Sequence, residues 1–183
     1  VEVLENNRIN LTYEIEESDV AEVSKIVIQG NEVFSDSKIK SLMKTKEKTI
    51  LRFLSSADRY DPDKLEYDKQ LVTEFYNNNG YPEFKFVTSI AQLSLNKNDF
   101  EIILSVKEGS KYEFGEIEVV NKLKKMNSEL IRDSLPFKSG DLYDASKIKT
   151  SVDQIKNAAE LSGYSFIMID PKLNIKSEKN IVD

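Results

Sequence analysis

Carboxylates are the side chains of this sequence best suited to acid–base chemistry, because the chain has 32 Asp and Glu residues and no His or Cys. Without His or Cys, Ser-His-Asp and Cys-His arrangements and His-bearing zinc sites are excluded. Glu14, Glu16 and Glu17 form one acidic group that a paired-carboxylate hydrolase could use. They also fit the polar positions and the end of a strand, so we predict no catalytic residues. A pocket holding two carboxylates about 5–9 Å apart would favour an enzyme instead.

Asp61, Asp63 and Glu66 form a second acidic group, of the kind that can hold calcium. The Asp-x-Asp-Gly spacing of a calcium loop is missing, however. Asp61 precedes Pro62, which suits the cap and first position of a helix, and acids in a first turn interact favourably with the helix dipole. We therefore expect neither a metal nor a cofactor.

The charge balance argues against nucleic acid as a partner. The net charge is −6 and the pI is about 5.0, whereas nucleic-acid binders usually present a basic face. Lys122, Lys124 and Lys125 form the one basic cluster, which fits a solvated loop. With 39% hydrophobic and 32% charged residues, the composition is typical of a globular protein with a packed core. No apolar run approaches the roughly 20 residues of a membrane helix.

An internal repeat organises the chain. A strand pattern with apolar residues at every second position occurs at 24–31 and returns at 115–121. After each strand come a short helical pattern and then a longer one. The longer helices share their beginnings and their ends, which are Tyr60-Asp61 and Tyr143-Asp144, then Gly80-Tyr81 and Gly163-Tyr164. Glycine suits the left-handed residue that closes a helix.

Two strand patterns, at 84–95 and 100–106, follow the first Gly-Tyr and are separated by a polar turn. The first unit therefore has the order β-α-α-β-β over residues 22–108. The second unit, 111–183, repeats this order, with strands expected at 115–121 and 165–175 and a truncated third strand. Residues 1–18 are interpreted as the terminal strand of a preceding unit.

These patterns resemble POTRA domains of the Omp85 family. The resemblance rests on Ile-x-Ile-x-Gly-Asn at 26–31, on the repeated Gly-Tyr, and on Val106-Lys107-Glu108-Gly109 with Tyr112. It is closest to the third and fourth POTRA domains of an outer-membrane assembly factor. One departure is Asn121, which stands where the first repeat has Gly30 and is expected to alter the turn without changing the fold.

The resemblance implies an α+β fold of tandem POTRA domains, each with a three-stranded mixed sheet covered on one face by two helices. It also implies a non-catalytic scaffold in the periplasm, attached to the outer membrane through a C-terminal β-barrel of the full-length protein. The implied partners are unfolded outer-membrane β-barrel proteins, assembly-machinery lipoproteins and that barrel. The alternative is a POTRA-type adaptor without a barrel, related to division or secretion.

Binding would then depend on surfaces, above all on strand edges, whose unpaired backbone groups can accept another strand. In the resembled fold the second strand of the domain is an edge. The predicted strand-binding residues are Glu83, Phe84, Lys85, Phe86, Val87, Thr88, Ser89 and Ile90. The competing interpretation is an edge that is solvated or covered by a loop.

Two further predictions concern the ends of the units. The strand at 8–15 alternates cleanly and is predicted to dock on a sheet edge, including by strand exchange between copies; its apolar residues are Ile9, Leu11, Tyr13 and Ile15. The predicted hinge between the units consists of Glu108, Gly109, Ser110 and Lys111.

Overall fold

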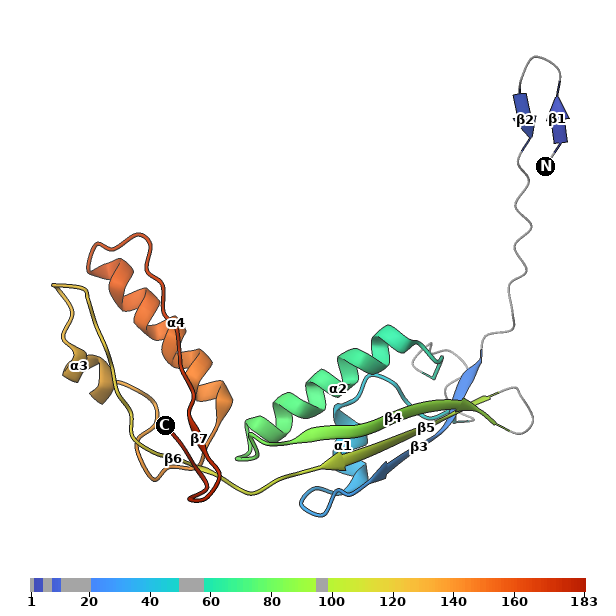
Figure 1. Cartoon of the computed structure of the whole chain (residues 1–183), viewed down its shortest axis with the longest axis horizontal. Coiled ribbons are helices and arrows are strands. Elements are labelled where there is room, and N and C mark those ends of the chain that lie inside the picture. The colour runs from blue at the N-terminus through green and yellow to red at the C-terminus, as the bar shows by residue number, and fades with distance from the viewer. Residues whose placement is uncertain (1, 5–7, 11–20, 50–57, 95–98) are drawn as a thin grey trace.

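The computed structural model describes residues 2–4, 8–10, 21–49, 58–94 and 99–183 (Figure 1). Within these ranges the chain forms two α+β units, each with a three-stranded sheet, preceded by a short hairpin. The predicted fold class, tandem β-α-α-β-β units with mixed sheets, is confirmed. Among the described residues, no helix is both long and apolar enough to cross a bilayer.

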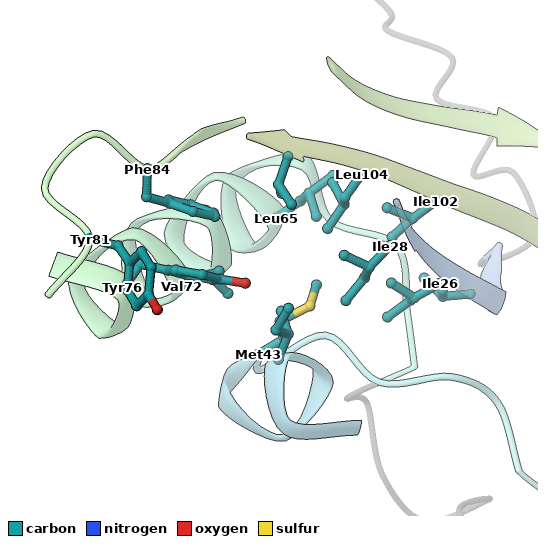
Figure 2. Close-up of a cluster of buried hydrophobic side chains, with 13 residues drawn as sticks. Ile26, Ile28, Met43, Leu65, Val72, Tyr76, Tyr81, Phe84, Ile102 and Leu104 are labelled. Carbon is teal, nitrogen blue, oxygen red and sulfur yellow. The ribbon is translucent and has the colours of Figure 1, made fainter. Parts of the chain in front are cut away.

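The first unit contains β3 (Glu22–Gln29), α1 (Asp36–Leu42), α2 (Pro62–Asn77), β4 (Lys85–Leu93) and β5 (Asp99–Lys107). The strand order is β3-β5-β4, with β3 parallel and β4 antiparallel to the central β5. Buried residues of β3, β5 and both helices form one apolar cluster, so the two helices pack on the same face of the sheet (Figure 2). Among the described residues of this unit, no helix lies on the opposite face.

Both helices of the first unit begin at a capping residue, and for α2 this is the Asp61 that the sequence predicts. Ser35 caps α1 by accepting the N–H of Lys38, and Asp61 caps α2 by accepting the N–H groups of Asp63 and Lys64. Pro62 occupies the first turn of α2, where its missing N–H costs no helical hydrogen bond. Just past the end of α2, Gly80 adopts a φ of +97°, the left-handed conformation expected from the sequence.

The core of the first unit centres on Tyr76, which is fully buried and stacks on Phe84 with ring centroids 3.9 Å apart. Val72 lies one turn and Leu65 three turns earlier on the same face of α2, as the helical spacing predicts. Fully burying such a side chain contributes about 1.5–3 kcal/mol. Thirteen buried residues make up this core cluster, against four in the second unit, so most of the hydrophobic stabilisation belongs to the first unit.

The second unit contains β6 (Glu113–Phe114), α3 (Ser128–Asp133), α4 (Ala145–Leu161), β7 (Ile175–Lys176) and β8 (Ile181–Val182). Its order β6-β8-β7 repeats the topology of the first sheet. Asn127 caps α3 and Asp144 caps α4. The described core consists of Tyr112, Phe114, Tyr143 and Val182.

The strands expected at 115–121 and 165–175 are wrong in extent. The structure has only β6, which ends at residue 114, and β7, which begins at residue 175. Both lie beside the central β8, which pairs with two residues on each side. Residues 116–121 and 165–173 form no strand in the structure, so alternation of apolar residues alone does not make a strand.

Residues near the N-terminus form a hairpin of β1 (Glu2–Leu4) and β2 (Arg8–Asn10), with Val3 opposite Ile9. The strand predicted at 8–15 thus begins in β2, which pairs with β1. The other predicted donor residues, Leu11, Tyr13 and Ile15, lie outside the described residues.

Candidate protein-binding surface

The two edges of the first sheet differ in whether their backbone is already paired. Beside β3, Val23 donates its N–H to Asp58 O at 2.6 Å, and its carbonyl accepts the N–H of Lys48 at 2.7 Å. The N–H of Ile26 is likewise bonded to the Glu47 carboxylate. The segments that follow α1 and precede α2 therefore cover the β3 edge.

The β4 edge lacks such a cover among the described residues, because β4 pairs with β5 on one side only and with no other strand. Ser94 donates its N–H to Asp99 O, toward β5. Backbone groups of an antiparallel strand point alternately to one side and the other. Ser89, Ala91 and Leu93 therefore direct their N–H and C=O groups away from the sheet, where an added strand could bond to them.

A β-bulge at Val87 divides this edge. Phe86 lies opposite Val106 and Thr88 lies opposite Ser105, so Val87 is an extra residue with no partner. Its side chain is 60% exposed. The bulge shifts the alternation by one residue, which accounts for the core-facing residues changing from even positions (Phe84, Phe86) to an odd one (Ala91) later in the strand.

The predicted edge residues are thus not equivalent. Glu83 and Phe84 precede β4, and Phe84 is buried in the core. Phe86 is partly buried against that core, whereas the other five, from Lys85 to Ile90, are exposed. Ile90 lies opposite Ile103, which lies opposite Val27, so an apolar row crosses the helix-free face of the sheet.

Among the predicted hinge residues, Glu108 belongs to the first unit. Its side chain is buried and accepts hydrogen bonds from the backbone N–H groups of Glu32 and Val33 and from the Tyr76 hydroxyl at 2.7 Å. Burial and the neighbouring Glu108 carboxylate raise the pKa of Tyr76 far above its ordinary value. Gly109, Ser110 and Lys111 are exposed, and Gly109 has a φ of +76°.

The units contact each other on both sides of this linker. The N–H of Tyr112 bonds to Gly80 O at 2.8 Å, and Leu142 lies so close that a Cβ on Gly80 would come within 2.7 Å of it. The Ser177 hydroxyl donates to the Glu83 carboxylate at 2.9 Å. These contacts were not foreseen, because they join turns far apart in the sequence.

Glu83 is the titratable group at this contact. The neighbouring hydroxyls of Tyr112 and Ser177, together with nearby Lys107 and Lys85, hold its pKa below the ordinary value. The fully buried Tyr112 hydroxyl makes no hydrogen bond of ordinary geometry, yet it is near enough to Glu83 to take part in this effect.

An open groove of about 550 Å³ lies between the units, which we call the inter-unit groove. One wall is a face of α2 and the other is the first two turns of α4, with Phe86 of β4 also lining it. The lining residues are Glu66, Lys69, Gln70, Thr73, Glu74, Asn77, Asn78, Phe86, Ala145, Ser146 and Lys149.

The acidic groups singled out for chemistry take other roles or lie elsewhere. Asp61 caps α2, and Glu66 pairs with Lys69 at 2.8 Å. Glu14, Glu16 and Glu17 lie outside the described residues. Within the part of the chain that the structure describes, no group of three or more His, Cys, Asp or Glu residues is placed to hold a metal.

Two stretches, residues 21–109 and 112–183, match the family model described as "POTRA: Surface antigen variable number repeat". The chain belongs to the POTRA family. The two matched stretches correspond to the two α+β units and together cover most of the sequence. The resemblance to POTRA domains of the Omp85 family is thus confirmed.

Curated relatives of these POTRA units include proteins named outer membrane protein assembly factor BamA. The protein from Neisseria meningitidis serogroup B is 26% identical over 180 residues, covering 98% of this chain and 23% of the relative. The protein from Buchnera aphidicola is 27% identical over 175 residues, covering 94% of this chain and 28% of the relative. The chain thus spans about a quarter of the length of these relatives.

Solved structures show the same fold. The crystal structure of Haemophilus influenzae BamA POTRA3-5 matches with a TM-score of 0.70 at 20% identity, covering 89% of this chain and 63% of that one. BamA from Haemophilus ducreyi lacking POTRA domains 1-3 matches with a TM-score of 0.61 at 12% identity, covering 90% of this chain and 28% of that one. At these identities the likeness concerns the fold alone.

Proposed function

We propose that this chain is a non-catalytic, periplasmic scaffold of the outer-membrane protein assembly machinery. It binds unfolded outer-membrane proteins and partner lipoproteins, in part by accepting a β-strand on the β4 edge. The proposal is supported by the POTRA match and by relatives named as outer membrane protein assembly factors.

The observation that carries strand addition is the difference between the two sheet edges. The β3 edge is covered by backbone and side-chain hydrogen bonds, whereas Ser89, Ala91 and Leu93 of β4 direct theirs outward. Charged residues, which commonly protect edges from pairing, are missing between Phe86 and Leu93. Because backbone pairing is largely independent of side-chain identity, such an edge suits partners of varied sequence.

Substitution of Ser89 by proline tests this mode of binding. Ser89→Pro removes an N–H that points away from the sheet, so the fold keeps all its β4–β5 hydrogen bonds while an added strand loses one. We expect an extended β-prone peptide to shift the NMR signals of residues 85–93 in the wild-type chain and to bind Ser89→Pro several-fold more weakly. The matched control, Ser89→Ala, keeps the N–H and should bind as the wild type does. Equal binding by all three chains would contradict addition at this edge.

A second use of strand pairing is exchange between copies, with residues 8–15 of one chain pairing along a sheet edge of another. The support is the regular alternation of Ile9, Leu11, Tyr13 and Ile15 and the short central strand β8 of the second unit. Deleting residues 1–18 should abolish any self-association seen by sedimentation. Self-association that persists unchanged after this deletion would exclude the exchange.

The adaptor without a barrel remains the second candidate, since a strand-accepting edge serves either role. Pull-down from a periplasmic extract distinguishes them: the proposed function expects unfolded outer-membrane proteins to be retained by the wild-type chain and lost with Ser89→Pro. Retention of division or secretion proteins alone would favour the adaptor.

A further inference from the structure

Helix α2 presents a second stripe of residues in addition to its buried one. Leu65, Val72 and Tyr76 face the core. A second set of residues recurs at helical spacing on a neighbouring face and lines the inter-unit groove: Glu66, Lys69 or Gln70, Thr73 and Asn77. The groove is therefore a continuous feature of the helix surface that the core does not use.

The groove lies beside the free strand edge. Phe86 belongs to β4 and also lines the groove, and its side chain is on the helix-covered side of the sheet, opposite Val106. Side chains of a strand alternate between the two faces of its sheet. A strand added to β4 would thus direct every second side chain to the side on which the groove opens.

The chemistry of the lining favours an uncharged aromatic occupant. Two carboxylates, Glu66 and Glu74, balance two ammonium groups, Lys69 and Lys149, so the groove offers no net charge for an ionic ligand. The Phe86 ring supplies an aromatic surface, and Lys69 Nζ already lies 5.9 Å from its centroid. Rings stack on rings and attract cations to their faces, so an aromatic side chain gains from both kinds of residue.

The second unit supplies a wall that the first cannot. Ala145, Ser146 and Lys149 come from the first turns of α4. Lys149 takes part in none of the ion pairs among the described residues, so its ammonium group is available to an incoming ring. The groove is complete only when both units are present.

We propose that the inter-unit groove binds an aromatic side chain of the strand that adds to β4, and that Lys149 of the second unit helps to hold it. This inference rests on the proposed function, because strand addition brings the side chain to the groove. Strand addition depends on backbone groups alone, and the aromatic site would add a preference for particular side chains. The site would also bring one partner into contact with both units.

The test uses the full 183-residue chain, labelled for NMR, and two nine-residue peptides. The peptides alternate Thr and Val, carry Lys at both ends and differ only in a central Phe or Ala. We expect both peptides to shift the signals of residues 85–93. The Phe peptide should bind several-fold more tightly and should also shift the signals of Ala145, Ser146 and Lys149.

Two variants on one helix face give the matched comparison. Lys149→Ala should weaken the Phe peptide roughly three-fold, the size of an exposed cation–π contact, and leave the Ala peptide unchanged. Lys156→Ala removes an exposed lysine two turns further along α4, outside the groove, and should change neither affinity.

The outcomes separate this inference from the proposed function. Equal affinity of the two peptides, with β4 shifted and α4 unmoved, overturns the aromatic site and supports strand addition. Shifts in α4 and Phe86 without shifts in residues 88–93 show an aromatic site in the groove but overturn strand addition, and with it the inference that the occupant belongs to an added strand. No shift in either place with either peptide overturns both.

Discussion

Glu108 shows how one polar side chain can hold a unit together. Its carboxylate is the common acceptor for two backbone N–H groups of the 31–34 turn and for the Tyr76 hydroxyl in the core. Buried donors that lose their acceptor pay the full cost of desolvation, about 1–3 kcal/mol each. The residue therefore couples the last strand, the first turn and the long helix.

We expect Glu108→Ala to lower the free energy of unfolding of the first unit by about 3 kcal/mol, because it leaves three donors without an acceptor. The corresponding fall in the melting temperature is roughly 10–20 °C for a unit of this size. Thermal unfolding followed by circular dichroism measures it. The control, Glu113→Ala, alters an exposed carboxylate and should change stability by less than about 0.5 kcal/mol. A loss below about 1 kcal/mol for Glu108→Ala would show that these bonds contribute little.

Glu83 provides a pH-dependent contact between the units. A carboxyl whose pKa is lowered in the folded state stabilises that state above its ordinary pKa, and the contribution is lost as the pH falls through the lowered value. The contact with Ser177 should therefore be fully formed at neutral pH and weaken below about pH 4.

Small-angle scattering should accordingly report a broader range of inter-unit orientations at low pH. Because other carboxylates titrate in the same range, Glu83→Gln at pH 7 gives the cleaner comparison and should show part of the same broadening. Glu113→Gln, which alters an exposed carboxylate at the start of β6, should not. Identical scattering of Glu83→Gln and the wild type would mean that other contacts fix the orientation.

Strand β4 combines a free edge with an irregularity that limits its use. Bulges twist an edge locally and are one means by which proteins discourage unwanted pairing. The bulge at Val87 interrupts the edge, so the regular part available to a partner runs from Thr88 to Leu93.

Deleting Val87 should lengthen the regular edge without turning any side chain to the other face, since the residues on each side already pair in step with β5. We expect the fold to remain, β-prone peptides to bind more tightly, and self-association to increase, as measured by NMR titration and sedimentation. Val87→Thr keeps the extra residue and should leave both properties near those of the wild type. A deletion variant with unchanged affinity would indicate that the bulge does not limit pairing.

Features set by neighbouring residues could be predicted from the sequence, whereas features that depend on distant residues could not. The cap Asp61 and the closing Gly80 of α2 follow from short-range chemistry and were readable from the sequence. The effect of the bulge is seen in the core-facing residues, which change from even positions (Phe84, Phe86) to an odd one (Ala91). The lengths of the β-strands in the second unit were overestimated, because a strand depends on a pairing partner that its own sequence does not reveal.

The surface where the units meet could not have been predicted in the same way. Phe86 and Lys149 line one groove but are far apart in the sequence, and no spacing rule relates them. Ser177 and Glu83 meet for the same reason, through the placement of one unit against the other. Asn121 stands where the first repeat has Gly30, and its side-chain amide donates to the carbonyls of Leu123 and Met126.

The whole molecule can be viewed as two units on a very short linker. Glu108 is fixed in the first core, and Tyr112 is fully buried in the second, so only three residues lie between the two anchors. Force exerted by a partner bound to the second unit would therefore be transmitted to Tyr76 and the first core, because the linker is too short to extend much. Force applied to one unit would therefore be transmitted to the other through this short linker.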